Sequence, residues 1–205
     1  MSPLSRPPFR AGTVWTHDLR QPPVGISLLP HVTFERIDLA FAARLAQNLS
    51  ATQVTEVEQR LAGGRRCYTA WAEDRLAGYG WVSFQHEEVQ ELGVRLQLQP
   101  CEAYIWDCYT FPAFRQLHIY AALLVWMLQQ LGEEGLCRAW IGANMDNLPS
   151  QRGIDRAGFT RVADLLISRE GGQRVLRLEG YPGVPESLVI EARRVFLSSL
   201  ELHRL

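Results

Sequence analysis

Hydrophobic and polar positions change their spacing several times along the chain, and the first clear period is helical. Apolar residues in segment 38–63 recur every three or four positions, which predicts two short helices. Ser50 or Thr52 can cap the second helix, and the glycine pair at 63–64 ends it. Helical structure is therefore expected before the first hairpin.

From residue 65 the apolar period changes to two, which is the period of a half-buried strand. Segment 65–84 predicts two strands joined at a tight polar turn, 73–75, and therefore a hairpin. A further strand pair is predicted at 92–99 and 102–110, where Pro100 separates the two strands. This part of the chain is expected to form antiparallel sheet.

The second half of the chain alternates between helices and strands. Segment 114–132 has a wide apolar face, which predicts a long helix that ends at Gly132. We expect a strand over 136–143, a short helix over 147–157, and strands near 160–168 and 174–178 joined by a glycine turn at 171–172. The order predicts an α+β or α/β fold in which strand 102–110, the long helix and strand 136–143 form a right-handed parallel unit.

The two ends of the chain differ from the middle. Residues 1–30 carry six of the eleven prolines and little periodicity, which predicts an extended arm over the domain. The tail forms an amphipathic helix in this interpretation, and its apolar stripe packs on the same domain or on a homodimer mate. The apolar stripe consists of Val189, Ala192, Phe196 and Leu200. We therefore divide the chain into an arm (1–30), one domain (31–180) and a C-terminal helix (181–205).

Composition and charge remove several classes of function. Hydrophobic residues make up 47% of the 205 residues, which is typical of a folded domain. The 22 acidic and 21 basic residues leave a net charge of -1, so nucleic acid is not an expected partner. All basic residues are arginine. Without lysine, Schiff-base and pyridoxal chemistry and a lysine-containing phosphate loop are excluded.

Cysteine spacing and apolar runs bear on metals and on the compartment. The four cysteines match neither a CxxC pair nor a zinc framework, so we interpret them as reduced core residues. The sequence His86-Glu87-Glu88 has no second histidine at helical spacing and is expected to be a solvated loop, so no metal site is predicted. No signal-like stretch opens the chain, and the longest apolar run, 119–128, is about half of a membrane span. A cytoplasmic protein without a membrane span is the expectation.

One ordered set of motifs extends through residues 66–167. It consists of the hairpin at 66–84, the strand end Tyr109-Thr110-Phe111-Pro112, Arg115 before a long helix, Asn147, Ser150, and Gly158-Phe159. This arrangement resembles the GNAT superfamily of acyl-CoA-dependent N-acyltransferases. The resemblance implies a mixed, mainly antiparallel central sheet with a splayed parallel strand pair and flanking helices.

A loop that leads directly into a helix presents free backbone N–H groups and the positive end of the helix dipole, which suits a pyrophosphate. The resemblance places coenzyme A there, with its pantetheine arm between the strands that end near Thr110 and Ala143. The cofactor-binding residues that it implies are Tyr109, Thr110, Phe111, Arg115, Gln116, Leu117, His118, Ile119, Tyr120, Asn147 and Ser150. Helix capping is the alternative role of Asn147.

The loop departs from the family pattern at two positions. The family carries small residues where this chain has His118 and Tyr120, and glycine is what lets backbone approach a phosphate closely. Two accounts remain open. In the first, the large residue at the second small position points away from the cofactor and protonated His118 contacts a phosphate oxygen. In the second, the pocket is degenerate and binds coenzyme A poorly.

Catalysis in the family needs a base for the attacking amine and an acid for the leaving thiolate. Glu102 is the first candidate for the base, because some members carry a strand glutamate there, and Asp107 is the second. Strict alternation places these two on opposite faces of the strand, and a solvated or ion-paired sheet carboxylate is the alternative for each. The usual tyrosine acid is replaced by Ile154, which leaves Tyr109, Ser150 or water as the acid, or a thiolate that departs unassisted.

The expected function is transfer of an acetyl or related acyl group from coenzyme A to an amine of a small molecule or peptide, by direct attack on the thioester. Trp71, Trp81 and Trp106 can line an apolar acceptor pocket. One alternative is a catalytically weak GNAT-like module that binds a ligand or a partner. Another is a relative that uses an aminoacyl-tRNA donor, against which the missing basic excess argues.

Overall fold

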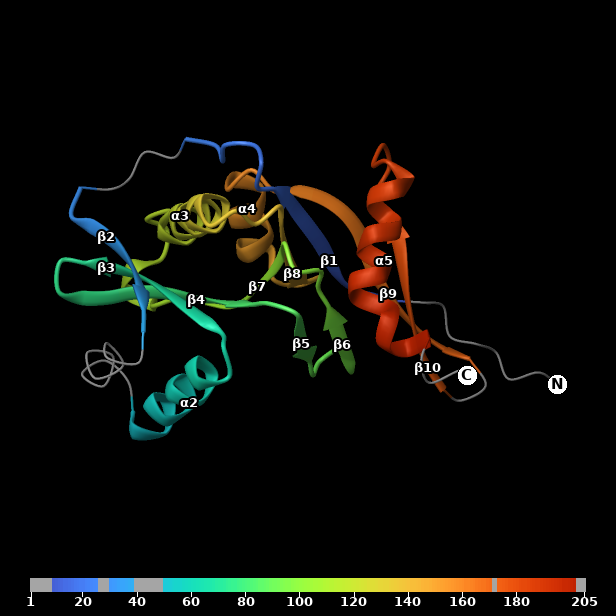
Figure 1. Cartoon of the computed structure of the whole chain (residues 1–205), viewed down its shortest axis with the longest axis horizontal. Coiled ribbons are helices and arrows are strands. Elements are labelled where there is room, and N and C mark those ends of the chain that lie inside the picture. The colour runs from blue at the N-terminus through green and yellow to red at the C-terminus, as the bar shows by residue number, and fades with distance from the viewer. Residues whose placement is uncertain (1–8, 26–29, 39–49, 171–172, 202–205) are drawn as a thin grey trace.

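The computed structural model of the chain describes residues 9–25, 30–38, 50–170 and 173–201. Within these residues, eight strands form one sheet in the order β10-β9-β1-β8-β7-β4-β3-β2, and β5 and β6 form a separate hairpin (Figure 1). The strands are β1 (Phe9–Asp18), β2 (Val32–Ile37), β3 (Arg66–Ala72), β4 (Arg75–Ser83), β5 (His86–Val89), β6 (Val94–Gln97), β7 (Glu102–Thr110), β8 (Arg138–Asn144), β9 (Thr160–Glu170) and β10 (Gln173–Gly180). The helices are α2 (Ala51–Ala62), α3 (Ile119–Glu133), α4 (Leu148–Arg156) and α5 (Glu186–Glu201), with a short 3-10 turn at Pro112–Phe114.

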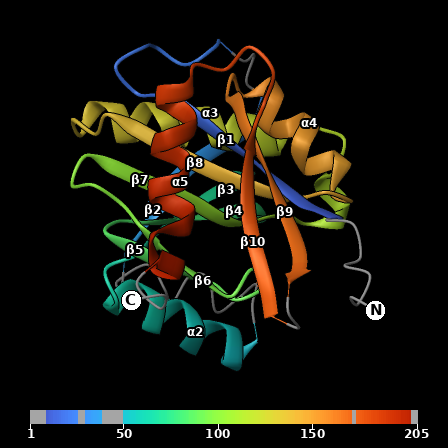
Figure 2. The same ribbon diagram turned by 90° about the vertical axis from the view of Figure 1, so that its right-hand side faces the viewer.

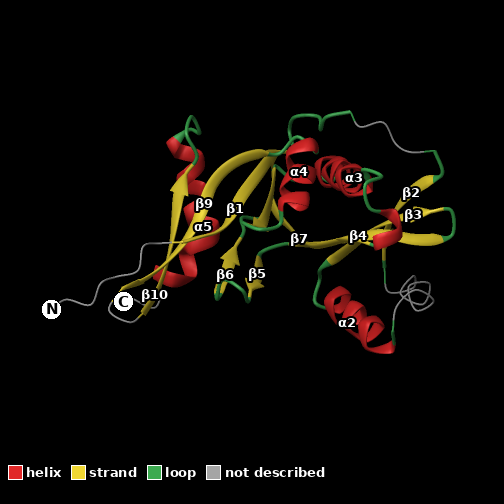
Figure 3. Ribbon diagram, turned by 180° about the vertical axis from the view of Figure 1, so that it is seen from behind, coloured by secondary structure: helices red, strands yellow, loops and turns green. Residues whose placement is uncertain are grey.

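Helices cover both faces of the large sheet. α3 and α4 pack on one face, where Trp15, Ile105 and Ile141 join their apolar residues in the largest core cluster. α2 and α5 pack on the other face (Figure 3), where Trp106 contacts the core clusters under both helices. The predicted mixed fold, mainly antiparallel with one parallel pair, is therefore confirmed.

The parallel pair lies at the centre of the sheet. β7 and β8 are paired only from Glu102 opposite Arg138 to Ile105 opposite Ile141. Both strands continue beyond this ladder, to Thr110 and Asn144, without pairing to each other. The strands therefore diverge, and α3 connects them as the crossover helix that the sequence predicts.

A β-bulge interrupts β7 just after the ladder with β8 ends. Trp81 faces Trp106 and Tyr79 faces Tyr109, so two residues of β7 oppose the single Gly80 of β4. Asp107 takes a left-handed backbone conformation with φ 43°. The extra residue turns the Asp107 side chain to the α2 face, so the predicted separation of Asp107 from Glu102 onto opposite faces is wrong.

The predicted N-terminal arm is wrong for residues 9–18. These residues form β1, which lies between β8 and β9 and pairs with both in antiparallel register. Val14 and Trp15 are fully buried on its two faces. The prolines that suggested an arm lie on either side of the strand, so the segment between them is free to donate its N–H groups to the sheet.

Several local predictions are confirmed by the described residues. Ser50 caps α2 with a capping box, and Gly63 ends it. The hairpin turn falls between β3 and β4. The other half of the predicted helix pair, 39–49, lies outside the described residues, as does the glycine turn at 171–172.

The pairing of segment 92–99 differs from the prediction. β6 pairs with β5, whereas β7 pairs with β4 and β8. The expected solvated loop at His86-Glu87-Glu88 is the strand β5, and Glu87 is buried there. A four-residue strand gives too short a pattern for its period to be recognised.

The long helix α3 begins at Ile119, five residues later than predicted. Pro112–Phe114 forms a 3-10 turn instead, and Gln116 and His118 take left-handed conformations before the helix. The C-terminal helix α5 packs on β6, β9 and β10 of its own domain (Figure 2). Its buried residues there include Val189, Ala192 and Phe196. The Leu200 side chain lies outside the described residues.

Two of the four cysteines form a disulfide, which corrects the prediction that all are reduced. Cys101 and Cys137 are bonded, with their Cα atoms 5.2 Å apart. Each stands directly before the first paired residue of β7 and β8, so the parallel register brings them together. Cys67 and Cys108 are free thiols.

In the described part of the chain, no helix combines the length and apolarity needed to cross a membrane.

Candidate active site

A cavity of about 830 Å³ opens where β7 and β8 diverge. Its middle is lined by Tyr104, Cys108 and Gly142 of the two strands. One end lies under α2 and β5 and the other lies between the N-terminal parts of α3 and α4. The cavity therefore joins the two faces of the sheet through the gap that the splayed strands leave.

Carboxylates predominate at the α2 end of the cavity. Five acidic residues line it, against the two guanidinium groups of Arg60 and Arg65; the acidic residues are Glu56, Glu87, Glu88, Glu91 and Asp107. Because this excess of negative charge faces a partly enclosed space, the α2 end favours a positively charged ligand.

Arg60 organises this end of the cavity. Its guanidinium forms ion pairs with Asp107 and with Glu56, one turn away on the same helix. The same group stacks over the rings of Trp106 and Trp81, at 4.7 and 5.1 Å from their centroids. The left-handed backbone at Asp107 and this arginine together fix the direction of the Asp107 carboxylate.

Glu87 is the most deeply buried carboxylate of the cavity, with 4% of its surface exposed. Arg65 donates two hydrogen bonds to it, at 2.7 and 3.0 Å, and the Ser83 hydroxyl donates a third. Burial opposes ionisation of Glu87, but these hydrogen bonds outweigh it and hold the pKa below its usual value. The side chain is therefore a fixed negative charge.

The free thiols do not supply a nucleophile. Burial raises the pKa of Cys67 to about 12 and raises the pKa of Cys108 as well. Both thiols stay protonated at neutral pH, and the thiolate is the reactive form. Within the described residues, no group of three or more histidine, cysteine or acidic side chains is arranged to hold a metal ion.

The opposite end of the cavity lies beside the N-terminus of α3, where Tyr120 lines it and the candidates Gln116, Leu117, His118 and Ile119 do not. Gln116 and His118 have φ values of 66° and 58°, in the region that glycine favours. Within the described part of the chain, no hydrogen bond engages the backbone N–H groups of residues 116–120. These groups, together with the helix dipole, form an anion-binding position. The His118 side chain contacts Arg156 of α4.

Tyr120 extends from α3 toward α4. Its hydroxyl lies 3.1 Å from the Ser150 hydroxyl, and both residues line the cavity. Burial raises the pKa of Tyr120, so its phenol stays protonated. Asn147 lines the same end and accepts a hydrogen bond from the Ser150 backbone at 3.2 Å, which is the helix-capping role considered for it.

The acetyltransferase (GNAT) family model matches residues 36–159, more than half of the chain. The chain belongs to the GNAT acetyltransferase family. No curated protein matches the sequence significantly.

Solved structures of GNAT proteins share the fold. An acetyltransferase of the family from Colwellia psychrerythraea has a TM-score of 0.53 at 14% identity, and the match covers 86% of this chain and 58% of that structure. A GCN5-related N-acetyltransferase from Sphaerobacter thermophilus has a TM-score of 0.55 at 15% identity, covering 86% and 54%. This chain therefore spans a little over half the length of these relatives.

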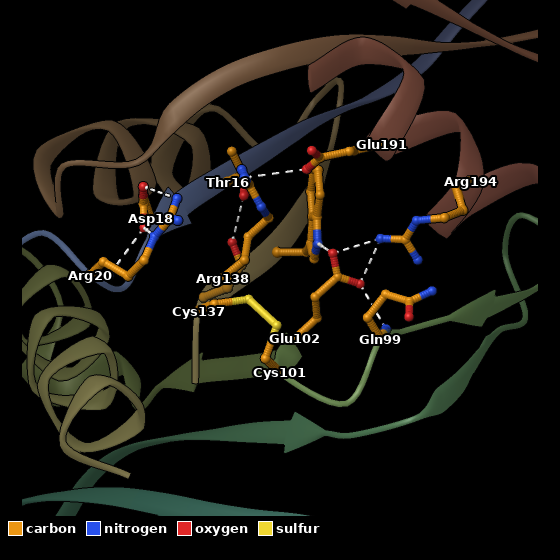
Figure 4. A network of polar contacts seen from close by, with 12 residues as sticks. Thr16, Asp18, Arg20, Gln99, Cys101, Glu102, Cys137, Arg138, Glu191 and Arg194 are labelled. Atoms are coloured by element: carbon orange, nitrogen blue, oxygen red, sulfur yellow. Dashed lines mark hydrogen bonds and ion pairs between the residues drawn. A yellow bond between two sulfur atoms is a disulfide. The ribbon is translucent and has the colours of Figure 1, made fainter. Parts of the chain in front are cut away.

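Glu102, the first candidate for the GNAT base, lies away from the cavity. Its carboxylate, 4% exposed, accepts two hydrogen bonds from Arg194 of α5 at 2.6 and 2.7 Å. The Gln99 backbone and the Trp140 indole donate to it at 2.8 and 3.3 Å (Figure 4). A second ion pair, Arg138 with Glu191, joins α5 to β8 beside the Cys101–Cys137 disulfide. The geometry matches the ion-paired alternative for Glu102.

The end of β7 carries the next group of candidates. The Tyr109 ring packs against Tyr79 and Phe111, at centroid distances of 5.8 and 5.2 Å. Arg115 stacks on Tyr109 and donates to the Thr110 carbonyl at 3.2 Å. None of these residues lines the cavity, whereas Asp107, Tyr120, Asn147 and Ser150 do.

Sequence reasoning missed several residues of the site. Arg60, Arg65 and Glu87 were not assigned to it, and Tyr120 was considered only as a residue of the phosphate loop. Their contribution depends on α2, β5 and the bulge, which bring distant segments together. The only signal available was the predicted acceptor pocket of Trp71, Trp81 and Trp106. Trp106 lines the cavity and Trp81 lines a smaller one beside it, whereas Trp71 is buried in the core and lines neither.

Proposed function

We propose that this GNAT protein transfers an acetyl group from acetyl-CoA to the amine of a cationic small molecule or peptide, by direct attack on the thioester. The observation that carries the proposal is the cavity at the divergence of β7 and β8, with the N-terminus of α3 at one end and a carboxylate-rich surface at the other. The two ends suit ligands of opposite charge. Because β7 and β8 diverge between these ends, an acyl donor at one end and an amine at the other can meet in the gap between the strands.

Acyl-CoA takes the α3 end in this proposal. The free backbone N–H groups of residues 116–120 suit its pyrophosphate, and the left-handed conformations of Gln116 and His118 keep these groups unpaired. Arg115 adds a positive charge beside them. The pantetheine arm lies between β7 and β8, with Asn147 and Ser150 on its α4 side.

The amine acceptor takes the α2 end. A protonated amine is attracted by the surplus of carboxylates there and loses its proton before it attacks the thioester carbon. Asp107 is the proposed proton acceptor, directly or through water, because its carboxylate lies on the cavity beside the divergence of the strands. Glu102 is not carried forward as the base because its carboxylate is held by Arg194.

A screen of amines tests the function. Acetyl-CoA is incubated with the protein and a panel of monoamines, polyamines, amino sugars and peptides, and release of the coenzyme A thiol is followed. Acceptor-dependent release that falls at least tenfold in Asp107→Asn, but not in the matched control Asp74→Asn in the exposed hairpin turn, supports the proposal. Thiol release that no amine accelerates contradicts it.

A catalytically weak binding module remains the second candidate. Tyr120 and His118 both carry large side chains at the cofactor end, which favours it. A module of this kind binds neither acetyl-CoA nor coenzyme A in titrations, whereas the proposed enzyme binds both. The cytoplasmic location and the homodimer stay predictions.

A further inference from the structure

Departure of coenzyme A leaves a negative charge on its sulfur, which a hydrogen-bond donor in the cavity can stabilise; the inference below rests on the proposed function. The position where the family carries a tyrosine is occupied by Ile154. Ile154 has none of its surface exposed and packs in the core beneath α3. α4 therefore presents no phenol to the cavity from this position.

α3 presents one instead. Tyr120, the second residue of α3, lies across Gly153 of α4: a Cβ added at Gly153 falls 2.3 and 2.7 Å from two carbons of the Tyr120 ring. Gly153 stands in the interior of α4, where glycine weakens a helix. The ring thus occupies space that only glycine leaves open, one residue before the position of the missing tyrosine.

The Tyr120 hydroxyl is oriented by its neighbours. The Ser150 hydroxyl, 3.1 Å away, can donate to the phenol oxygen, which leaves the phenol hydrogen free to point elsewhere. Tyr120 and Ser150 line the cavity together with Cys108 of β7 and Gly142 and Ala143 of β8. The phenol therefore lies at the gap between the strands. Because burial raises its pKa, the donor form persists at neutral and mildly alkaline pH.

We propose that Tyr120 donates a hydrogen bond to the coenzyme A sulfur as the thioester breaks. The amine nitrogen forms a bond to the carbonyl carbon, the carbon–sulfur bond breaks, and its electron pair stays on sulfur. The thiolate is held by the Tyr120 O–H until it takes a proton from solvent. The nitrogen loses two protons through Asp107 or water, one from the ammonium before attack and one after the bond to carbon forms. One proton is balanced by the proton that the thiolate takes up, and the other is released to solvent.

Product binding tests this without an acceptor. Coenzyme A and acetyl-CoA are titrated calorimetrically at pH 7 and pH 9 into wild type, Tyr120→Phe and the matched control Tyr181→Phe, whose hydroxyl accepts from Arg161 elsewhere. Free thiols have a pKa near 8.5, so a donor at the sulfur favours thiolate and strengthens coenzyme A binding as the pH rises. From pH 7 to pH 9, the affinity of wild type and Tyr181→Phe for coenzyme A is expected to rise at least fivefold relative to their affinity for acetyl-CoA, which has no thiol. In Tyr120→Phe this relative rise should disappear.

Three results overturn the inference, and they are distinguishable. An equal pH-dependent gain in wild type and Tyr120→Phe places the phenol away from the sulfur while leaving the proposed function intact. Tighter binding of both ligands to Tyr120→Ala than to wild type makes the ring an obstruction. Absence of binding by wild type overturns the proposed function together with the inference.

Discussion

At the scale of the residue, the two acidic side chains of β7 show how little a carboxylate's position in the sequence says about its role. Glu102 and Asp107 are five residues apart on one strand. Glu102 is enclosed by Arg194 and Trp140, whereas Asp107 is partly exposed on the cavity, beside Arg60. The bulge turns Asp107 to the same face of the sheet as Glu102, where the two carboxylates meet different helices, and no pattern in the local sequence indicates the bulge.

Glu102→Gln is expected to lower stability by about 1–3 kcal/mol, because Arg194 loses its charged partner and α5 loses a contact with β7. Urea unfolding measures the loss. Turnover measured well below the unfolding transition is expected to change less than twofold. A tenfold fall in turnover at normal stability would return Glu102 to the role of base.

Glu87→Gln is expected to lower stability by about 1 kcal/mol at pH 7, after screening by solvent is allowed for. Because folding depresses the pKa of Glu87, its contribution is present above the unfolded value of 4.5 and is lost as the pH falls through the folded value. The difference in free energy of unfolding between Glu87→Gln and wild type should therefore shrink as the pH is lowered from 7 to 3. The exposed neighbour, changed as Glu88→Gln, serves as control; a difference that grows on acidification would contradict the assignment.

At the scale of the element, the segments with a clear period were predicted well, whereas β1, with ten residues, and β5, with four, were missed. The long helix, the hairpin and the capped α2 follow from period, caps and turns alone. β1 was missed because prolines on either side hide a strand whose partners lie more than a hundred residues away. β5 was missed because four residues establish no period.

Gly153 and Tyr120 are expected to be coupled. Alanine normally stabilises a helix interior by about 1 kcal/mol relative to glycine, but its Cβ would strike the Tyr120 ring here. Gly153→Ala should therefore destabilise the wild-type protein and stabilise Tyr120→Ala. Thermal or urea unfolding of the wild type, the two single variants and the double variant gives the cycle. The same sign in both backgrounds would show that the ring does not lie across α4.

The disulfide follows from the parallel register rather than from cysteine spacing. Cys101 and Cys137 precede matched residues of β7 and β8, so an observer who predicted the parallel pair could have placed them side by side. Spacing alone excluded a metal site and gave no reason to join them. Because Cys101 and Cys137 are bonded, the cysteines no longer support the prediction of a cytoplasmic location.

Replacing both cysteines, as Cys101→Ser with Cys137→Ser, is expected to lower stability by about 2–4 kcal/mol, as for a closed loop of this length. The free energy of unfolding in denaturant is compared between the double variant and Cys67→Ser, which removes a free thiol instead. If Cys67→Ser does not fold, Cys108→Ser serves as the control. Equal stability of the double variant and wild type would contradict a bond between these residues.

At the scale of the whole molecule, the sheet joins two ends of opposite character. β7 and β8 diverge beyond a ladder of four residue pairs, and the cavity passes between them from the start of α3 to the carboxylates under α2. Family resemblance predicted the splayed pair and the α3 end. It could not predict the acceptor end, which α2, β5 and β7 build from residues far apart in the sequence.

Arg115→Ala is expected to weaken acetyl-CoA binding by about 1–3 kcal/mol, because a charge beside the free N–H groups of α3 is lost. Arg177→Ala, which removes an exposed guanidinium on β10, is the control and should bind as wild type does. Equal affinities of the two variants would place the phosphates elsewhere.

Calorimetric titration of the wild-type protein with acetyl-CoA, up to millimolar ligand, shows whether the cavity binds an acyl donor. We expect saturable one-to-one binding in the micromolar range, despite the large side chains of His118 and Tyr120. An absence of heat over the whole range would contradict the proposed function, since a cavity that holds no acyl-CoA cannot perform the proposed transfer.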